Sequence, residues 1–317
     1  MEKIQDCINL IIVVFNFKNI LVTGGAGFIG SNLIKHISEN YKYSNILSID
    51  NYSSGKTKNH IIKKNIKYLK LDCQNIFKSK NNIFKKFNPN YIFHFGEFSR
   101  VVPSFKKTDD CFNFNIKGTL NIINYALKKK SNLIYSASSM HLGGRENENL
   151  SPYAWTKAKN VELIKNFSKW FGLKYFILYF YNVYGENQIK TTYMSSVIGI
   201  FEFQYERNKK LTVVRPGNQR RDFTHVDDVV KGTALCAIKG IKKEYQLGSG
   251  RSYSILKVAK MFKHKIKMIN KRRGEKFTGN ANYLQAKKDL GYTPIKSLDK
   301  YIKAFIRKSR KVRVSGS

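Results

Sequence analysis

The chain has 317 residues, of which 58 are lysine or arginine and 21 are aspartate or glutamate, giving a formal net charge of +37. This length holds one large α/β domain or two smaller ones, and 42% hydrophobic residues suit a globular protein with an ample core. The basic residues are spread along the chain without a dense arginine patch, zinc-ligand spacing or aromatic RNA-binding motif, so we interpret the charge as compositional and expect no nucleic-acid partner.

Residues 1–17 form an N-terminal extension before the first predicted strand. Its apolar run, 8–15, is too short to span a bilayer and lacks a small-residue cleavage site, so we expect an extra or loosely docked segment, with an interfacial anchor as the alternative. No apolar run of membrane-spanning length follows. The four cysteines are far apart, which excludes CxxC metal or redox sites; they are Cys7, Cys73, Cys111 and Cys236. We therefore predict a reduced, cytoplasmic protein with no metal site and no stable membrane insertion.

Three glycines, Gly24, Gly27 and Gly30, lie between the predicted strand 20–23 and a helical stretch. The first glycine allows a tight turn, the second lets the backbone approach a pyrophosphate, and the third lets the helix pack closely on the strand. Asp50 ends the next apolar run, 20 residues after Gly30. A carboxylate there accepts both ribose hydroxyls and repels a 2′-phosphate, although a strand-end aspartate can also simply cap a turn. The spacing therefore predicts a dinucleotide site that favours NAD over NADP.

Apolar runs then alternate with helical stretches, which predicts a Rossmann-type, doubly wound parallel α/β sheet. The predicted strands are 20–23, 46–50, 67–71, 91–95, 132–136, 175–179 and 244–247, and the long predicted helices are 31–40, 108–128 and 151–171. After Gly185 this periodicity breaks into loops and short helices. We therefore predict an NAD-binding domain over 18–185 and, over 186–317, a mostly substrate-binding smaller lobe interleaved with the last strands of the sheet.

A candidate catalytic group begins at Ser151, a good N-cap for the predicted helix 151–171. Tyr153 and Lys157 are four residues apart and share one face of that helix, where an ammonium lowers the pKa of a phenol by favouring phenolate. Such a tyrosine can take a proton from a sugar hydroxyl while hydride leaves the carbon for NAD. We select Ser138, near the end of the preceding strand, to hydrogen-bond the reacting oxygen. Tyr-x-x-x-Lys on its own is also common on solvated helix faces.

Together these motifs resemble the extended short-chain dehydrogenase/reductase family of nucleotide-sugar epimerases and dehydratases. The resemblance extends from about residue 18 to 305 and rests on residues 24–30, 50–55, Asn115 with Gly118 and Thr119, Ser138 with Tyr153 and Lys157, 181–185, and 221–226. It implies an NAD-dependent enzyme that binds a nucleotide sugar. It also implies a homodimer formed through the helices predicted at 108–128 and 151–171.

The resemblance implies a role for each matching residue. Catalysis is assigned to Ser138, Tyr153 and Lys157. Cofactor binding is assigned to Gly24, Gly27, Phe28, Ile29, Gly30, Asp50, Asn51, Ser53, Gly55, Asp72, Cys73, Phe95, Gly96, Asn115, Ser136, Tyr153, Lys157 and Tyr181. Substrate binding is assigned to Ser138, Asn182, Arg221 and Arg272. Three of these residues have structural alternatives: Asp72 as a strand-end cap, Asn182 as a turn residue, and Arg221 in a surface ion pair.

The residues that follow Ser138 narrow the expected chemistry. In the family's 4,6-dehydratases the strand-end hydroxyl precedes Asp-Glu, whereas here Ser139 and Met140 follow it, and methionine cannot move a proton. The same gap disfavours UDP-glucuronate decarboxylases. We therefore expect a 4-epimerase, acting on a UDP-hexose by oxidation and re-reduction at C4. The alternatives are another nucleotide-sugar enzyme of the family (dehydratase, decarboxylase or 4-ketoreductase) and a non-enzymatic basic binding protein on the same fold.

Two further positions depart from or refine the family pattern. Glu97 stands where small apolar residues are usual, and two roles are open: contact with the sugar or an ion pair with Arg100. Counted from Arg272, Gly279 falls near the position that limits the size of the sugar pocket. A glycine there leaves room for an N-acetyl group.

Overall fold

The computed structural model describes residues 18–41, 44–143, 145–191, 193–271, 273–274 and 279–315. The N-terminal extension 1–17 and the predicted substrate ligand Arg272 lie outside these residues. Along the described ranges, no helix is both long enough and apolar enough to cross a membrane. Cys73, Cys111 and Cys236 are buried as free thiols.

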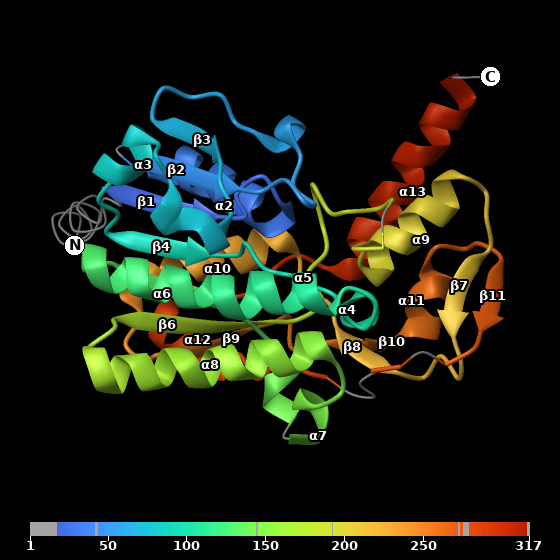
Figure 1. Cartoon of the computed structure of the whole chain (residues 1–317). Helices are drawn as coiled ribbons and strands as arrows, with labels where there is room; N and C mark the ends of the chain where they lie inside the picture. The colour runs from blue at the N-terminus through green and yellow to red at the C-terminus, as the bar shows by residue number, and fades with distance from the viewer. Residues whose placement is uncertain are drawn as a thin grey trace, which may run out of the picture.

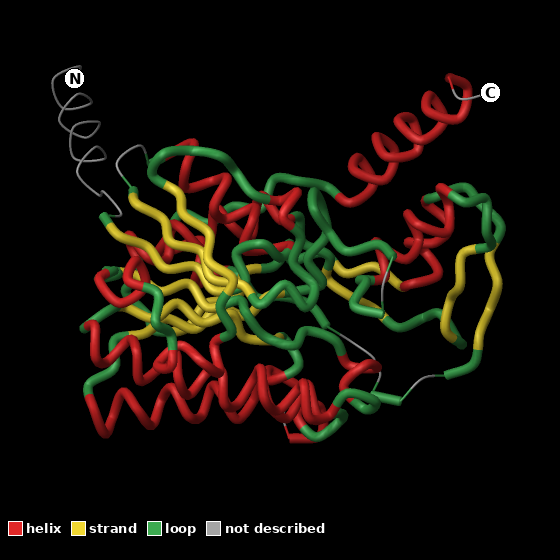
Figure 2. The backbone as a smooth tube through the Cα atoms, turned by 45° about the horizontal axis from the view of Figure 1, so that its top comes forward, coloured by secondary structure: helices red, strands yellow, loops and turns green. Residues whose placement is uncertain are grey.

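Seven parallel strands form the central sheet, in the order β3-β2-β1-β4-β5-β6-β9 (Figure 2). They are β1 (Asn19–Thr23), β2 (Asn45–Asp50), β3 (Ile66–Lys70), β4 (Tyr91–His94), β5 (Asn132–Ser138), β6 (Tyr175–Phe180) and β9 (Glu244–Leu247). The order reverses between β1 and β4, which pair from Ile20 opposite Tyr91 to Thr23 opposite His94. Such a reversal leaves a crevice at the carboxyl ends of the strands, where α/β proteins bind ligands. The predicted doubly wound α/β fold is thus confirmed.

Helices cover both faces of this sheet (Figure 1). On one face lie α2 (Phe28–Asn40), α10 (Val226–Lys239) and α12 (Leu284–Leu290), and on the other α5 (Thr108–Phe112), α6 (Gly118–Lys129) and α8 (Pro152–Phe171). Successive residues of a strand point to opposite faces of the sheet. Because neighbouring residues of β1 are apolar, both of its faces pack against helices. Val22 packs in the cluster that contains Leu33 of α2, whereas Leu21 packs in the cluster that contains Val161 of α8.

The helix predicted over 108–128 is wrong as a single element. A π-helical turn, Asn113–Lys117, separates α5 from α6. Within this turn the carbonyl of Asn115 accepts a hydrogen bond from the Asn160 side chain at 2.8 Å. π-Turns of this kind concentrate at functional sites, because they redirect side chains and free backbone groups. In contrast, α8 begins as predicted, with the Ser151 hydroxyl accepting a hydrogen bond from the Ala154 N–H at 3.1 Å.

A smaller lobe lies beside the carboxyl ends of the strands and has its own core, which includes Phe201, Phe262 and Ile302 (Figure 1). It contains the parallel pair β7 (Leu211–Val214) and β11 (Ile266–Ile269) and the antiparallel pair β8 (Arg220–Asp222) and β10 (Ser252–Ser254). Its helices are α9 (Val197–Glu206), α11 (Ile255–Met261) and α13 (Leu298–Ser315); the remaining short helices are α3 (Asn82–Lys86), α4 (Val101–Ser104) and α7 (Arg145–Glu148). Because β9, α10 and α12 return to the central sheet, the chain after residue 185 contributes to both parts.

Candidate active site

A cavity of about 900 Å³ runs along the carboxyl ends of the strands and into the smaller lobe. Its walls combine residues of the central sheet, such as Asp50 and Ser138, with residues of the smaller lobe, such as Phe201 and Arg221. Most of the residues predicted to bind cofactor or substrate lie in this wall. They are Gly24, Gly27, Phe28, Ile29, Gly30, Asp50, Asn51, Ser53, Asp72, Cys73, Phe95, Gly96, Ser136, Ser138, Tyr153, Lys157, Asn182 and Arg221.

The three glycines form the turn between β1 and α2 at one end of the cavity. Gly24 has a φ of +69°, and a Cβ there would lie 2.8 Å from the Gly96 nitrogen, so this turn accepts only glycine without rearrangement. The helix α2 starts immediately after Gly27, with no side chain capping its N-terminus and no acid in its first turn. Its N-terminal N–H groups and positive dipole end are therefore available to an anion such as a pyrophosphate.

Asp50 and Asp72 lie at the carboxyl ends of β2 and β3, beside this turn. The Asp50 carboxylate accepts hydrogen bonds from the N–H groups of Ala26 and Tyr52 at 3.0 and 2.8 Å, and its burial raises its pKa. The Asp72 carboxylate caps a turn by accepting from the Gln74 N–H at 2.8 Å and also accepts from the Asn51 amide at 2.7 Å. The glycine turn, the uncapped N-terminus of α2 and the two carboxylates together fit the pyrophosphate and ribose of NAD.

Three predicted cofactor residues pack behind the cavity rather than in its wall. A Cβ on Gly55 would lie 2.8 Å from an Asp50 oxygen, so this glycine permits the loop to fold over that carboxylate. Asn115 is fully buried and accepts a hydrogen bond from the Phe98 N–H at 2.7 Å. The Tyr181 hydroxyl donates to the Gln246 side chain at 2.6 Å. In the described structure these residues hold the backbone that shapes the site.

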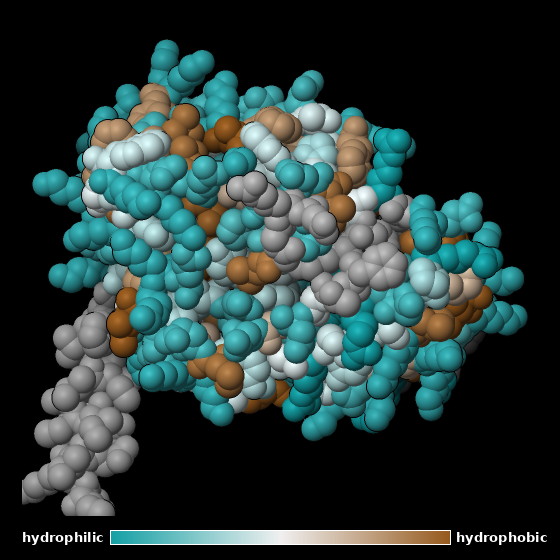
Figure 3. Space-filling view, turned by 90° about the horizontal axis from the view of Figure 1, so that it is seen from below, coloured by the Kyte–Doolittle hydropathy of each residue, from teal (hydrophilic) through white to brown (hydrophobic). Residues whose placement is uncertain are grey.

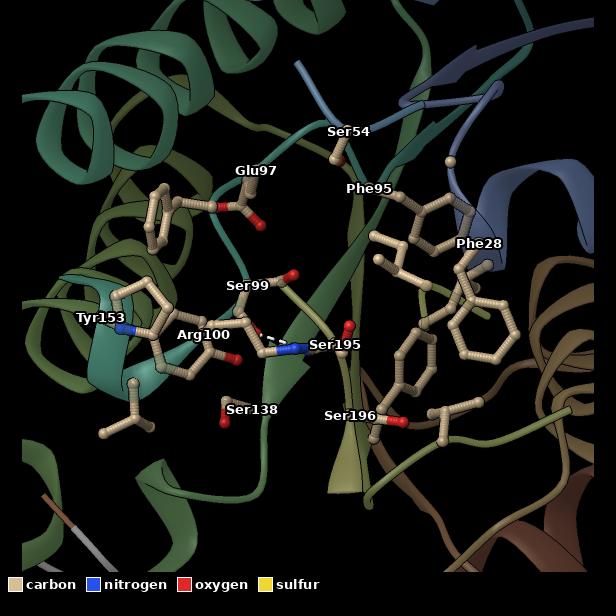
Figure 4. A pocket seen from close by; sticks show the side chains of 18 of the residues that line it. Phe28, Ser54, Phe95, Glu97, Ser99, Arg100, Ser138, Tyr153, Ser195 and Ser196 are labelled. Carbon is tan, nitrogen blue, oxygen red and sulfur yellow. Dashed lines mark hydrogen bonds between the residues drawn. The ribbon is translucent and has the colours of Figure 1, made fainter. Parts of the chain in front are cut away.

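Tyr153, in the first turn of α8, faces Ser138 at the end of β5. Figure 4 shows both near Arg100, which comes from the segment between β4 and α4, while Phe28 and Phe95 lie on the opposite side of the cavity. The pKa of Tyr153 lies above its usual value because burial raises it, while a hydrogen bond with Ser138 and the positive charge of Arg100 act in the opposite direction. The Arg100 guanidinium is held by the Met194 and Ser99 carbonyls, each at 2.7 Å. Nothing in the motif of Tyr153 and Lys157 had indicated Arg100 as a neighbour.

Lys157 lies one turn further along α8, and its ammonium hydrogen-bonds both the Glu97 carboxylate and the Ser136 carbonyl. The side chains of Lys157 and Glu97 are only 6% and 3% exposed. Glu97 also accepts hydrogen bonds from Thr119, Tyr135 and Asn160, at 3.1, 3.0 and 3.0 Å. The two roles left open for Glu97 were contact with the sugar and an ion pair with Arg100. The ion pair that Glu97 forms is with Lys157 instead of Arg100. Thr119 and Asn160 are polar residues on the buried faces of the helices predicted at 108–128 and 151–171. Such polar residues on a buried face are the sequence signal that could have indicated this cluster.

The side of the cavity that holds the predicted substrate residues Asn182 and Arg221 is built on the end of β8. Asn182 has a φ of +30° and donates to the Asp222 carbonyl at 3.0 Å, and Arg221 donates to the Arg220 carbonyl at 2.9 Å. The buried Asp222 carboxylate accepts from the N–H groups of Ser249, Gly250 and Ala281, at 2.9, 2.8 and 3.1 Å. It thereby ties together the loops around Arg221, a function that the sequence did not indicate.

Comparison with known proteins agrees with this geometry. Residues 20–248 match the sequence profile of the NAD dependent epimerase/dehydratase family. A putative UDP-glucose 4-epimerase of Methanocaldococcus jannaschii is 30% identical over 78% of this chain and 82% of its own length. A dTDP-D-glucose 4,6-dehydratase of Dictyostelium discoideum is 29% identical over 77% of this chain and 61% of its own length.

Among solved structures, the UDP-glucose 4-epimerase of Thermotoga maritima with UDP-glucose is similar to this chain, with a TM-score of 0.82 and 28% identity. The likeness covers 93% of this chain and 99% of the other. Both the smaller lobe and the central sheet therefore have counterparts in a nucleotide-sugar enzyme.

Proposed function

The chain belongs to the NAD-dependent epimerase/dehydratase family, and we propose that within this enzyme family it is a nucleotide-sugar 4-epimerase acting on a UDP-hexose. The observation that carries the proposal is the meeting of Ser138 and Tyr153 in the cavity wall, with Met140 at the position where a dehydratase has an acid. The Met140 N–H donates to the Ser138 hydroxyl at 3.3 Å. This arrangement can move a proton at one sugar oxygen, but Met140 cannot eliminate water from the neighbouring carbons.

The acids that line the cavity support the same choice. Among the described lining residues they are Asp50, Asp72 and Glu97. The first two lie at the end of the cavity formed by the glycine turn, and Glu97 is occupied by Lys157. None of these three is free to act as the acid–base partner that a 4,6-dehydratase or a decarboxylase of this family requires.

In the proposed reaction, Tyr153 takes the proton of the C4 hydroxyl as hydride leaves C4, and the 4-keto sugar then rotates in the cavity. Hydride returns to the other face of C4 while Tyr153 gives the proton back to the C4 oxygen. Ser138 hydrogen-bonds the same oxygen, and the charge of Arg100 favours the phenolate of Tyr153. Bound NAD supplies the hydride acceptor and donor, so no external oxidant is consumed. Asn182 and Arg221 bind the sugar diphosphate, for which a guanidinium is well suited.

The proposal extends to the residues around the diphosphate and the sugar. Arg272, outside the described residues, is proposed to bind the diphosphate together with Arg221. Gly279 lines the cavity, and no atom of the described residues lies within 4 Å of a Cβ placed on it, which supports a pocket with room for an N-acetyl group.

We also propose that the protein is a homodimer formed through α5, α6 and α8. On this side Phe112 and Trp155 stack with their ring centroids 5.4 Å apart, although they are 38% and 37% exposed. Figure 3 shows the α8 face, where apolar side chains appear among mostly hydrophilic ones. In contrast, Ile123 of α6 is fully buried and packs on the sheet. The stacked pair is therefore the part of this surface that a second copy would cover.

The experiment that tests the proposed activity is product analysis by NMR. The purified protein is incubated with UDP-glucose, UDP-galactose, their N-acetyl forms and the UDP-uronates. We expect interconversion of one pair of C4 epimers without added reductant. Release of a 4-keto-6-deoxy sugar would assign the chain to the dehydratases instead. Absence of turnover combined with tight, salt-sensitive nucleic-acid binding would favour the non-enzymatic alternative.

A further inference from the structure

We propose that Glu97 is a positioning residue for the reaction: its buried carboxylate holds the Lys157 ammonium against the Ser136 carbonyl and keeps that ammonium charged in the cavity wall. This inference rests on the proposed function, since it assigns Glu97 a role toward the lysine of that site. It concerns a carboxylate at a position where the resemblance leads one to expect a small apolar side chain.

The carboxylate of Glu97 is held from several directions. One oxygen bonds to Lys157, and the other accepts from Thr119 of α6, Tyr135 of β5 and Asn160 of α8. Burying a charge is costly unless the charge is paired and its hydrogen bonds are made, and here both conditions are met. The contacts therefore form a built site for an ionised carboxylate rather than a chance burial.

This cluster continues to the glycine turn. The His94 ring hydrogen-bonds Thr119 at 2.9 Å and Thr23 at 2.6 Å, and the Thr23 hydroxyl accepts from the Gly96 N–H at 3.0 Å. Burial lowers the pKa of His94 to about 4, so the ring is neutral near pH 7. The network therefore contains one negative charge, on Glu97, and one positive charge, on Lys157, and it connects the cofactor turn to the catalytic helix.

The charge on Lys157 depends on this pairing. Burial lowers the pKa of the Lys157 ammonium, and the Glu97 carboxylate opposes that effect. Cys111 and His94 also interact electrostatically with Lys157. Burial raises the pKa of the Cys111 thiol to about 11, so this group is neutral, as the His94 ring is. Lys157 also lies over the Tyr135 ring, 4.4 Å from its centroid. Without Glu97 the lysine would be a buried cation with no carboxylate partner in this cluster, and it would release its proton more readily.

Glu97 acts on Tyr153 in the opposite sense. Its negative charge raises the pKa of Tyr153, while Arg100 and the Ser138 hydrogen bond lower it; Cys111 and Tyr135 are further titratable neighbours. Removing the charge of Glu97 should thus lower the pKa of both Lys157 and Tyr153. Both limbs of a bell-shaped profile of kcat/KM against pH would then move toward lower pH.

The test compares Glu97→Gln, which keeps the shape and removes the charge, with Glu97→Asp, which keeps the charge at a greater distance. The first readout is the pH profile of kcat/KM. The second is the pH dependence of reductive methylation of Lys157 in protein stripped of NAD, followed by peptide mass spectrometry. The matched control is Glu162→Gln, which removes an exposed carboxylate of the same helix that pairs with Lys159.

We expect both limbs to shift to lower pH in Glu97→Gln and the methylation midpoint of Lys157 to fall with them. One pKa unit corresponds to an about tenfold faster reaction below the midpoint, because only the neutral amine reacts. Glu97→Asp should give an intermediate midpoint, and Glu162→Gln the wild-type one. If Glu97→Gln does not fold, a Glu97→Asp midpoint below the wild-type value supports the proposal.

An unchanged methylation midpoint in a folded Glu97→Gln or Glu97→Asp protein, with only a lower Tm, would mean that the cluster is merely structural. The methylation readout needs no substrate. A shifted midpoint in a protein that epimerises none of the tested sugars would therefore contradict the proposed function while retaining the assignment of Glu97 to Lys157.

Discussion

The α-carbon of Gly30 faces the carbonyl oxygen of Gly24 so closely that a Cβ at residue 30 would lie 2.3 Å from it. This contact between the first turn of α2 and the end of β1 fixes the shape of the loop that we assign to the pyrophosphate. Glycine is required at residue 30 because neither backbone segment can move away without changing that loop.

Gly30→Ala is therefore expected to lower stability by about 1–3 kcal/mol, as other overpacked sites do, and to lose bound NAD. Thermal unfolding and the NAD content of the denatured protein measure the two effects. Gly279→Ala is the control, because a Cβ there has no atom within 4 Å in the part of the chain that the structure describes. Full NAD content in Gly30→Ala would contradict the assignment of this turn.

Tyr153→Phe is expected to reduce kcat by about 10²–10⁴-fold, the usual contribution of a positioned acid–base group. Bound NAD should be retained, because the glycine turn and Asp50 lie at the other end of the cavity. Steady-state kinetics and NAD content together make the measurement. Near-wild-type turnover would exclude Tyr153 as the base.

Arg100→Met is expected to move the acid limb of the kcat/KM profile to higher pH. The base is the phenolate, which exists only above the pKa of Tyr153. Arg100 lowers that pKa, so removing its charge raises the pKa and activity is lost at a higher pH. Arg100→Lys, which keeps the charge, should stay closer to the wild-type profile. An acid limb that does not move in Arg100→Met would show that this charge does not act on Tyr153.

Trp155→Asp is expected to dissociate the proposed homodimer. Loss of a central aromatic contact, at about 2 kcal/mol or more, corresponds to a dissociation constant at least about 30-fold higher. Analytical ultracentrifugation over a concentration series measures it. Ile62→Asp provides the control, since Ile62 is 98% exposed and outside the proposed interface. A dimer of unchanged affinity in Trp155→Asp would place the interface elsewhere.

Most strands of the central sheet were predictable because they are short apolar runs that end in a polar turn, whereas β3 and β9 mix polar and apolar residues. Residues at those ends, such as Asp50 and Ser138, meet in one cavity because parallel strands bring their carboxyl ends to the same edge. The small strands β8 and β10 were not predicted. Each has three residues, and their pairing joins segments about 30 positions apart, which leaves no local period to detect.

The cluster around Glu97 shows the same limit within the site. Its members, at positions 97, 119, 135, 157 and 160, come from four segments, and a lone glutamate carries no mark of its partner. The break between α5 and α6 could not be predicted from the sequence for a related reason. The residues 113–117 continue an ordinary helical pattern, and the Asn115 carbonyl in the π-turn bonds to Asn160, which lies far along the chain.

The central claim is that the chain inverts C4 of a UDP-hexose by removing and returning hydride at that carbon. Its most direct test is conversion of the accepted UDP-sugar in D₂O, with the product observed by NMR. The account predicts the C4 epimer with protium retained at every ring carbon, because the hydride returns without exchange with solvent. A 4-keto-6-deoxy product, or deuterium at a ring carbon of the product, would contradict it.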